Sequence, residues 1–328
     1  MYYKEWRISL KKILALLSLV AVFILTACGQ TTKTDATTTQ AAVEEKSEVT
    51  LTNGKEDVTV KTDLKKIVVF DLGIADTIRE LGFVDRIVGM PLKTLPTYLK
   101  DLPSSIQSTG SMVEPDIEAI AALEPDLIIA SGRTIKYLDQ LKEIAPTVIF
   151  SVDQKDYWTS VSKNIRLVAS LFGKEAGAKA EEEIQSLEAS IKKIADVNEK
   201  SNDKTLTLML NEGKMSAFGA DSRFAFLYQS LKFKATDAKI EDSRHGQEMS
   251  FEGIKEINPD TIVLLNRTLA IGGDNSNADT VLNNELFKET NAVKNNHVIQ
   301  LTSDLWYLSG GGLQSTKLMI EDIQKVLQ

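Results

Sequence analysis

Two arginines occupy equivalent places in an internal repeat and could bind one anion together. Residues 118–133 read EAIAALEPDLIIASGR, and residues 252–267 read EGIKEINPDTIVLLNR, at an offset of 134 residues. Each repeat predicts a short helix, a Pro-Asp turn, a buried strand and an arginine just past the strand. Ligands of open α/β sheets bind beyond the carboxyl ends of the strands. We therefore expect Arg133 and Arg267 to serve the same ligand from two lobes; the alternative is that both are merely solvated.

The elements around the repeats must bring these arginines together. Residues 66–70 read as a buried strand, residues 71–81 as a helix ended by glycine, and residues 86–89 as another strand, which is a parallel α/β unit. Residues 174–197 carry isoleucine and leucine at helical spacing, which predicts one long helix, and strands resume at residues 205–210. We predict an α/β fold of two Rossmann-like lobes joined by a long backbone helix, with the ligand cleft between the lobes.

The domain boundaries follow from these patterns. Residues 49–60 alternate apolar and polar side chains around Asn53-Gly54, which predicts a hairpin at the start of the folded part. We expect an N-terminal lobe at 48–173, the interlobe helix at 174–200 and a C-terminal lobe at 201–328.

The N-terminus has the pattern of a lipoprotein signal. Basic residues precede the apolar run 13–27, which is shorter than the roughly 20 residues of a membrane-spanning helix and suits a secretory signal. Cys28 follows in Leu-Thr-Ala-Cys, which looks like a bacterial lipoprotein cleavage box. We expect residues 1–27 to be removed, Cys28 to be lipidated, and residues 28–47 to form a flexible tether. The alternative is an ordinary signal followed by an incidental cysteine.

Composition excludes several classes of site and partner. One cysteine cannot form a disulfide within the chain or a cysteine-built zinc site, and two histidines cannot build a multi-histidine metal site. With 38 basic and 46 acidic residues the net charge is −8, which argues against nucleic acid as the main partner. The chain has no Gly-x-Ser-x-Gly and no His-Glu-x-x-His motif. We expect a binding protein without an intrinsic cofactor and not an enzyme, although a carboxylate-only hydrolase stays open.

Two similar lobes, a long helix and a lipoprotein signal resemble the helical-backbone class of substrate-binding proteins of ABC importers for ferric siderophores, haem and cobalamin. The resemblance covers residues 49–328 and includes the opening strand KKIVVFD and both repeats. It implies a lipid-anchored monomer on the extracellular face of the membrane, of the Gram-positive type, that works with permease and ATPase subunits. It also implies that Glu118 and Glu252, which head the repeats, dock on the permease. Without a partner, each carboxylate would still be favoured by its helix dipole, by about 0.3–1 kcal/mol.

Within that class the chain is most similar to binders of ferric catecholate siderophores of the petrobactin or enterobactin type. The similarity implies a ligand-binding set, namely Arg133, Arg223, Arg267, His245 and Tyr307. A ferric tris-catecholate carries a charge of about −3, and planar guanidinium groups supply positive charge and several donors to its oxygens.

His245 and Tyr307 could also bond to iron directly. Fe(III) favours oxygen ligands such as phenolate and also binds imidazole. A bis-catecholate siderophore leaves part of the octahedral shell open, and in relatives a histidine and a tyrosine can fill it. The alternatives are a surface loop position for His245 and core packing for Tyr307.

Other ligands within the same class of transporter stay open. Haem would use tyrosine or histidine without three arginines, cobalamin would favour an aromatic cleft, and hydroxamate or citrate-type iron chelates are further alternatives. An adhesin or a structural surface lipoprotein is the remaining alternative outside transport.

Overall fold

The computed structural model describes residues 47–52, 56–241, 243, 245–274 and 276–325. The predicted signal at 1–27, the lipidation site Cys28, nearly all of the tether and the turn Asn53-Gly54 lie outside the described residues. Within the described ranges, no helix is long and apolar enough to span a bilayer.

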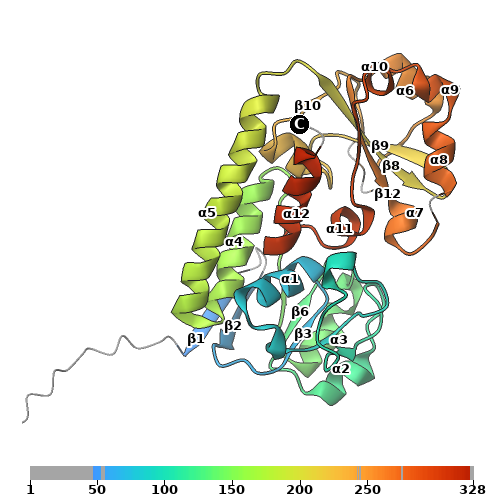
Figure 1. The fold of residues 1–328 in the computed structure, drawn as a ribbon. Helices are drawn as coiled ribbons and strands as arrows, with labels where there is room; N and C mark the ends of the chain where they lie inside the picture. The colour runs from blue at the N-terminus through green and yellow to red at the C-terminus, as the bar shows by residue number, and fades with distance from the viewer. Residues whose placement is uncertain (1–46, 53–55, 242, 244, 275, 326–328) are drawn as a thin grey trace, which may run out of the picture. The chain divides into compact units, whose positions relative to one another are not determined.

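The first lobe contains a five-stranded parallel sheet with the strand order β5-β4-β3-β6-β7. Its central strands β3 and β6 are labelled in Figure 1. Every residue of β3 and β6 is buried, as expected of central parallel strands that are covered on both faces. The predicted hairpin is present as an antiparallel pair, β1 with β2. The strands are β1 (Glu48–Thr52), β2 (Asp57–Lys61), β3 (Ile67–Val69), β4 (Ile87–Met90), β5 (Gln107–Ser108), β6 (Leu127–Ala130) and β7 (Thr147–Ile149).

The helices of this lobe connect successive strands. The predicted first helix is α1, in which Asp71 caps the N-terminus and Gly82 ends the helix with a φ of 98°. The α-helices are α1 (Leu72–Leu81), α2 (Ile117–Leu123) and α3 (Leu138–Ile144), and the 3-10 turns are η1 (Val84–Arg86), η2 (Thr97–Leu99) and η3 (Ile135–Tyr137).

The second lobe is built on a mixed sheet with the order β11-β9-β8-β12-β13, in which β10 also pairs with β8. Its centre is parallel, but β9 runs antiparallel to β8. The reason is local: Glu212 and Gly213 both have positive φ and close a two-residue hairpin after β8. The strands are β8 (Lys204–Asn211), β9 (Lys214–Phe218), β10 (Lys234–Ala235), β11 (Gln247–Glu248), β12 (Thr261–Asn266) and β13 (Val298–Gln300).

Short helices surround this sheet. They are the π-helical segment η4 (Phe226–Ser230) and the α-helices α6 (Phe251–Ile257), α7 (Arg267–Ala270), α8 (Ser276–Leu282), α9 (Glu285–Lys288), α10 (Asn291–Lys294) and α11 (Ser303–Leu308).

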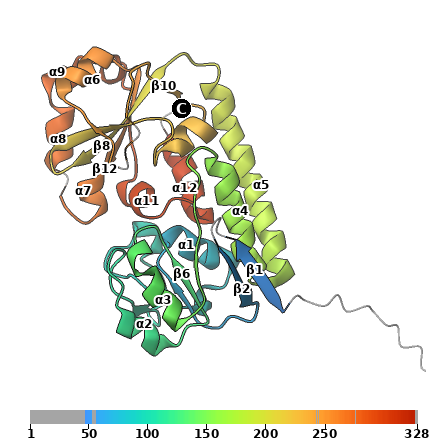
Figure 2. The same ribbon diagram turned by 180° about the vertical axis from the view of Figure 1, so that it is seen from behind.

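The predicted long helix is α5 (Gly173–Asn198), whose 26 residues make a rod of about 39 Å. It packs against α4 (Tyr157–Ser170) and runs beside both lobes (Figures 1 and 2). Its buried residues include the predicted stripe of Ile184, Leu187, Ile191 and Ile194. The final helix, α12 (Leu313–Gln324), contacts both α5 and α1.

A buried carboxylate joins α1 to the start of α12. Asp76 accepts hydrogen bonds from the backbone N–H groups of Gln314 (2.9 Å) and Ser315 (2.6 Å) and from the hydroxyl of Tyr98 (3.3 Å). Burial raises the pKa of Asp76 to about 6, against the lowering effect of the hydrogen bonds from α12. The two segments can approach this closely because glycines stand in both; a Cβ on Gly73 would lie 2.8 Å from the carbonyl oxygen of Gly310.

We expect Gly312→Ala to destabilise the protein by about 1–3 kcal/mol, because its Cβ would clash with the carbonyl oxygen of Gly73 and the carboxylate of Asp76. Gly177→Ala is the control: it lies inside α5, where a Cβ meets nothing within 4 Å, and it should stabilise by up to about 1 kcal/mol. Urea unfolding measures both changes. An unfolding midpoint for Gly312→Ala at or above that of the wild type would contradict this description of the junction.

Candidate functional site

Four of the five predicted ligand-binding residues line one cavity of about 670 Å³. They are Arg133, Arg223, His245 and Tyr307. The remaining lining residues are Asp71, Ser131, Gly132, Gln154, Asp221, Ser222 and Ser243. The fifth predicted residue, Arg267, does not line the cavity but bonds to Tyr307. Both lobes contribute to the cavity, which lies beyond the carboxyl ends of β3 and β6, where open α/β sheets bind ligands.

The two copies of the sequence repeat also have matching local structures. Its two helices end at Glu124 and Asn258 in the left-handed conformation, with φ of 49° and 47°. The aspartate of each Pro-Asp turn then accepts a hydrogen bond from the backbone N–H at the start of the neighbouring strand. Asp126 accepts from Lys66 N (2.9 Å), and Asp260 accepts from Lys204 N (3.0 Å).

The arginines of the repeat consequently occupy matching places in the two lobes. Arg133 follows β6 after two residues, and Arg267 follows β12 directly as the first residue of α7. Asn266 caps α7 by accepting a hydrogen bond from Leu269 N (3.1 Å), which places Arg267 on the first turn. Both side chains reach Tyr307 on α11.

Tyr307 is the meeting point of three guanidinium groups. Arg267 Nε donates a hydrogen bond to Tyr307 Oη (2.7 Å). Arg133 and Arg223 each donate a hydrogen bond to the backbone carbonyl of Tyr307, at 2.9 Å and 3.1 Å. The guanidinium carbons of Arg133, Arg223 and Arg267 lie 5.1, 4.3 and 5.5 Å from the centroid of the tyrosine ring. These distances are within the range of cation–π attraction.

The three guanidinium groups are not in direct contact with carboxylates, although Asp71 and Asp221 line the same cavity. In the described part of the chain, none of the three arginines forms an ion pair with Asp or Glu, whereas Arg79 and Arg166 do. Burial lowers the pKa of Arg223, and the charges of Arg133 and Arg267 lower it further, against the raising effect of Tyr307. An anionic ligand would be a direct partner for these guanidinium groups.

The environment of Tyr307 favours ionisation of its phenol. Partial burial raises the pKa, but the hydrogen bond from Arg267 and the charges of the three arginines together lower it more, so that the pKa of Tyr307 lies below its usual value of 10.0. Asp71 shows the opposite balance: burial raises the pKa of its carboxyl group despite hydrogen bonds from Ile74 and Gly73 and the nearby charge of Arg133.

His245 and the two glutamates are exposed. His245 belongs to the loop before β11, and its backbone N–H donates to Ser243 Oγ (3.3 Å). Glu118 and Glu252 each occupy the second position of their helix, α2 and α6. Neither glutamate forms an ion pair with another described residue, so both carboxylates are available to a partner.

Sequence reasoning missed several residues of this site, and Asp71 and Asn211 are the two with contacts or charge at the arginine cluster. Asp71 lines the cavity, and its place directly after the buried segment at 66–70 is a signal that could have revealed it. Asn211 accepts a hydrogen bond from Arg267 Nη1 (2.5 Å). Nothing in the local sequence of Asn211 indicates this contact, because 56 residues separate it from Arg267.

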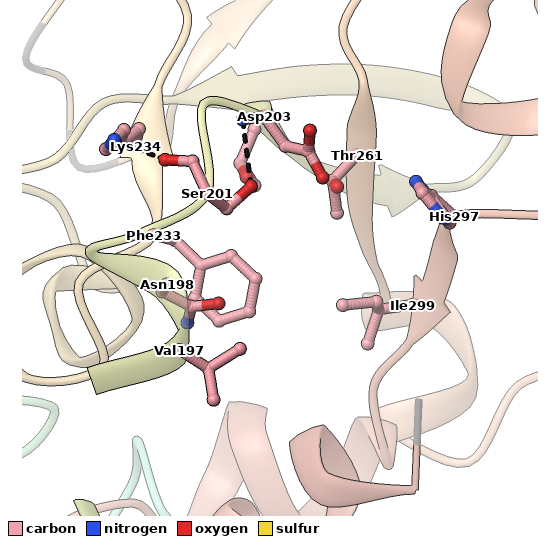
Figure 3. A pocket seen from close by; sticks show the side chains of 10 residues that line it. Val197, Asn198, Ser201, Asp203, Phe233, Lys234, Thr261, His297 and Ile299 are labelled. Atoms are coloured by element: carbon pink, nitrogen blue, oxygen red, sulfur yellow. Dashed lines mark hydrogen bonds between the residues drawn. The ribbon is translucent and has the colours of Figure 1, made fainter. Parts of the chain in front are cut away.

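Two other cavities contain none of the predicted ligand-binding residues. One of about 250 Å³ lies at the end of α5, with Val197, Asn198 and Phe233 on one side and His297 and Ile299 on the other (Figure 3). The other, of about 700 Å³, is lined by the segment after β4 and by α7.

Comparisons with known proteins show the family of this chain. The profile of the periplasmic binding protein family matches residues 67–305. The petrobactin-binding protein YclQ of Bacillus subtilis is 36% identical over 318 residues, which cover 96% of this chain and 98% of the relative.

Two solved structures are also similar. The iron uptake ABC transporter substrate-binding protein PiuA of Streptococcus pneumoniae is 62% identical, with a TM-score of 0.83 over 86% of this chain and 100% of that one. The catecholate-siderophore binding protein VctP of Vibrio cholerae is 30% identical, with a TM-score of 0.79 over 85% of this chain and 99% of that one.

In the ligand-free protein we expect Arg267→Met to raise the pKa of Tyr307, because the substitution removes the hydrogen bond to the phenol and the charge beside it. Phenolate absorbance measures this during an alkaline titration, with Tyr307→Phe in each background to isolate the signal of this residue. Arg86→Met is the control, since Arg86 pairs with Asp85 and does not line the cavity. An unchanged titration of Tyr307 in Arg267→Met would contradict the proposed origin of the shift.

Proposed function

The chain belongs to the periplasmic binding protein family, and we propose that it is the substrate-binding component of an ABC importer that captures a ferric catecholate siderophore. The observation that carries this proposal is the cluster of Arg133, Arg223 and Arg267 around Tyr307, without an acidic partner among the described residues. Three guanidinium groups match a ferric tris-catecholate in charge, about −3, and in their donors toward its oxygens. The catecholate and petrobactin binders among the similar proteins support the same ligand class.

Iron enters this proposal as cargo, held mainly by the siderophore. His245 and Tyr307 line the same cavity and complete the coordination of Fe(III) when a tetradentate bis-catecholate leaves part of the shell open. The lowered pKa of Tyr307 supports this role, because phenolate is the form that bonds to a hard ion. With a hexadentate tris-catecholate, the arginines alone hold the complex.

The proposed setting is the extracellular face of the membrane. Lipid on Cys28 anchors the mature chain, residues 28–47 tether it, and it acts as a monomer with lobes at 48–173 and 201–328 joined through 174–200. A single acyl chain holds a protein only marginally, whereas the two chains of diacylglycerol suit stable anchoring.

Glu118 and Glu252 are the proposed contacts with the permease. Equivalent positions in the repeat place one exposed carboxylate on each lobe, at the start of α2 and of α6. Two symmetric acidic contacts suit a permease with a basic residue on each of two subunits, and such charged contacts contribute mostly to orientation and association rate.

Quenching of tryptophan fluorescence tests the ligand class, since Trp306 adjoins Tyr307. We expect ferric bis- and tris-catecholates to bind with Kd values below about 1 μM, and ferric citrate, ferric hydroxamates, haem and cobalamin to bind more weakly. Tight binding of one of those rivals instead would reassign the ligand, and binding of none would favour a structural surface protein.

Tyr307→Phe should remove the charge-transfer band of the bis-catecholate complex and weaken its binding. Tyr137→Phe, outside the cavity, is the matched control.

Charge reversal tests the docking proposal. Glu118→Lys combined with Glu252→Lys should abolish siderophore-dependent uptake by cells and leave ligand affinity unchanged, because neither residue lines the cavity. The matched control reverses Glu143 on α3 and Glu256 on α6, which are also exposed. Uptake at the wild-type rate in the Glu118/Glu252 variant would contradict the proposed docking role of these two residues.

A further inference from the structure

We propose that Asn211 is a positioning residue that determines how strongly the site discriminates ligands by charge. It holds Arg267 through a neutral amide, so that this guanidinium keeps its full charge beside Tyr307, which lines the cavity. This inference rests on the proposed function and concerns the same site.

The position of Asn211 is set by the hairpin between β8 and β9. Asn211 pairs with Lys214 across the turn, and the two residues between them have positive φ. The turn is also tied to α7, because Glu212 N donates a hydrogen bond to Thr268 Oγ1 (2.8 Å). The half-buried side chain of Asn211 is therefore held beside the residue that precedes Thr268, which is Arg267.

Two hydrogen bonds determine the orientation of Arg267. Nη1 donates to Asn211 Oδ1 (2.5 Å), and Nε donates to Tyr307 Oη (2.7 Å). A guanidinium group is planar, so two acceptors at different nitrogens define its plane beside Tyr307. Without Asn211, the bond to Tyr307 would be the single described hydrogen bond of this side chain.

The acceptors that orient the cluster share one property: they are uncharged while Tyr307 is protonated. Arg133 and Arg223 donate to a backbone carbonyl, and Arg267 donates to an amide and a phenol. A carboxylate at position 211 would make at least as strong a hydrogen bond, but it would also pair with the charge of Arg267. An amide therefore orients this arginine without neutralising it. The retained positive charge of Arg267 matters most for the ligand with the largest negative charge.

Asn211→Asp tests the inference, because it keeps the shape of the side chain and adds one negative charge. We expect its affinity for a ferric tris-catecholate, of charge about −3, to fall about tenfold or more, and its affinity for a bis-catecholate, of charge about −1, to fall by a smaller factor. Asn211→Leu removes the acceptor without adding charge, so its affinity should fall by similar factors for both complexes. Fluorescence quenching at two salt concentrations measures these affinities, and the loss in Asn211→Asp should shrink at high salt.

Asn202→Asp is the matched control. It changes the net charge equally but precedes the opposite end of β8, a strand of eight residues that spans about 25 Å. Unfolding midpoints show whether each variant remains folded. Equal losses for both complexes in Asn211→Asp would indicate a merely structural role and overturn the inference, as would unchanged binding in either Asn211 variant. If the wild type binds neither catecholate complex, the proposed function itself fails.

Discussion

Mutual repulsion of three guanidinium groups is the constraint on which the site depends. Arg133, Arg223 and Arg267 all lie within 5.5 Å of the ring centroid of Tyr307, where like charges destabilise one another. The protein offsets this repulsion without a direct ion pair. The electron-rich face of the ring attracts the guanidinium groups, and the backbone carbonyl of Tyr307 and its phenol oxygen accept hydrogen bonds from them. The cluster is thereby oriented in advance for an anion, which is the condition for tight binding without reorganisation.

The scaffold serves this cluster by placing the ends of strands from two lobes around α11. Arg133 and Arg267 stand beyond parallel strands, whose carboxyl ends lie at one edge of each sheet. Tyr307 stands just before Gly310–Gly312, and the chain is held there by Asp76 at the N-terminus of α12. The junction between α1 and α12 therefore sets where Tyr307 lies relative to the first lobe.

Several elements could be predicted because their signals are local. The stripe of Ile184, Leu187, Ile191 and Ile194 indicated α5, and Asp71 with Gly82 bounded α1. The repeat was informative for a different reason. A helix, a Pro-Asp turn, a strand and an arginine form a weak pattern when they occur once, but their recurrence 134 residues later predicted equivalent roles for the two arginines. The antiparallel β9 was not predicted, because Glu212-Gly213 resembles an ordinary loop until both positive φ values are known.

By itself, the sequence determined the α/β class, the long helix, the paired repeats and the residue types able to bind an anionic iron complex. The tertiary structure alone decided which atoms meet: that the three arginines converge on one tyrosine, that none of the acceptors of their hydrogen bonds is a carboxylate, and that Asn211 accepts a hydrogen bond from Arg267. The physical reason is the separation along the chain of the residues that interact. Helical and strand periodicity is encoded within a few residues, whereas Arg133 and Tyr307 are 174 residues apart and meet only after the lobes have packed.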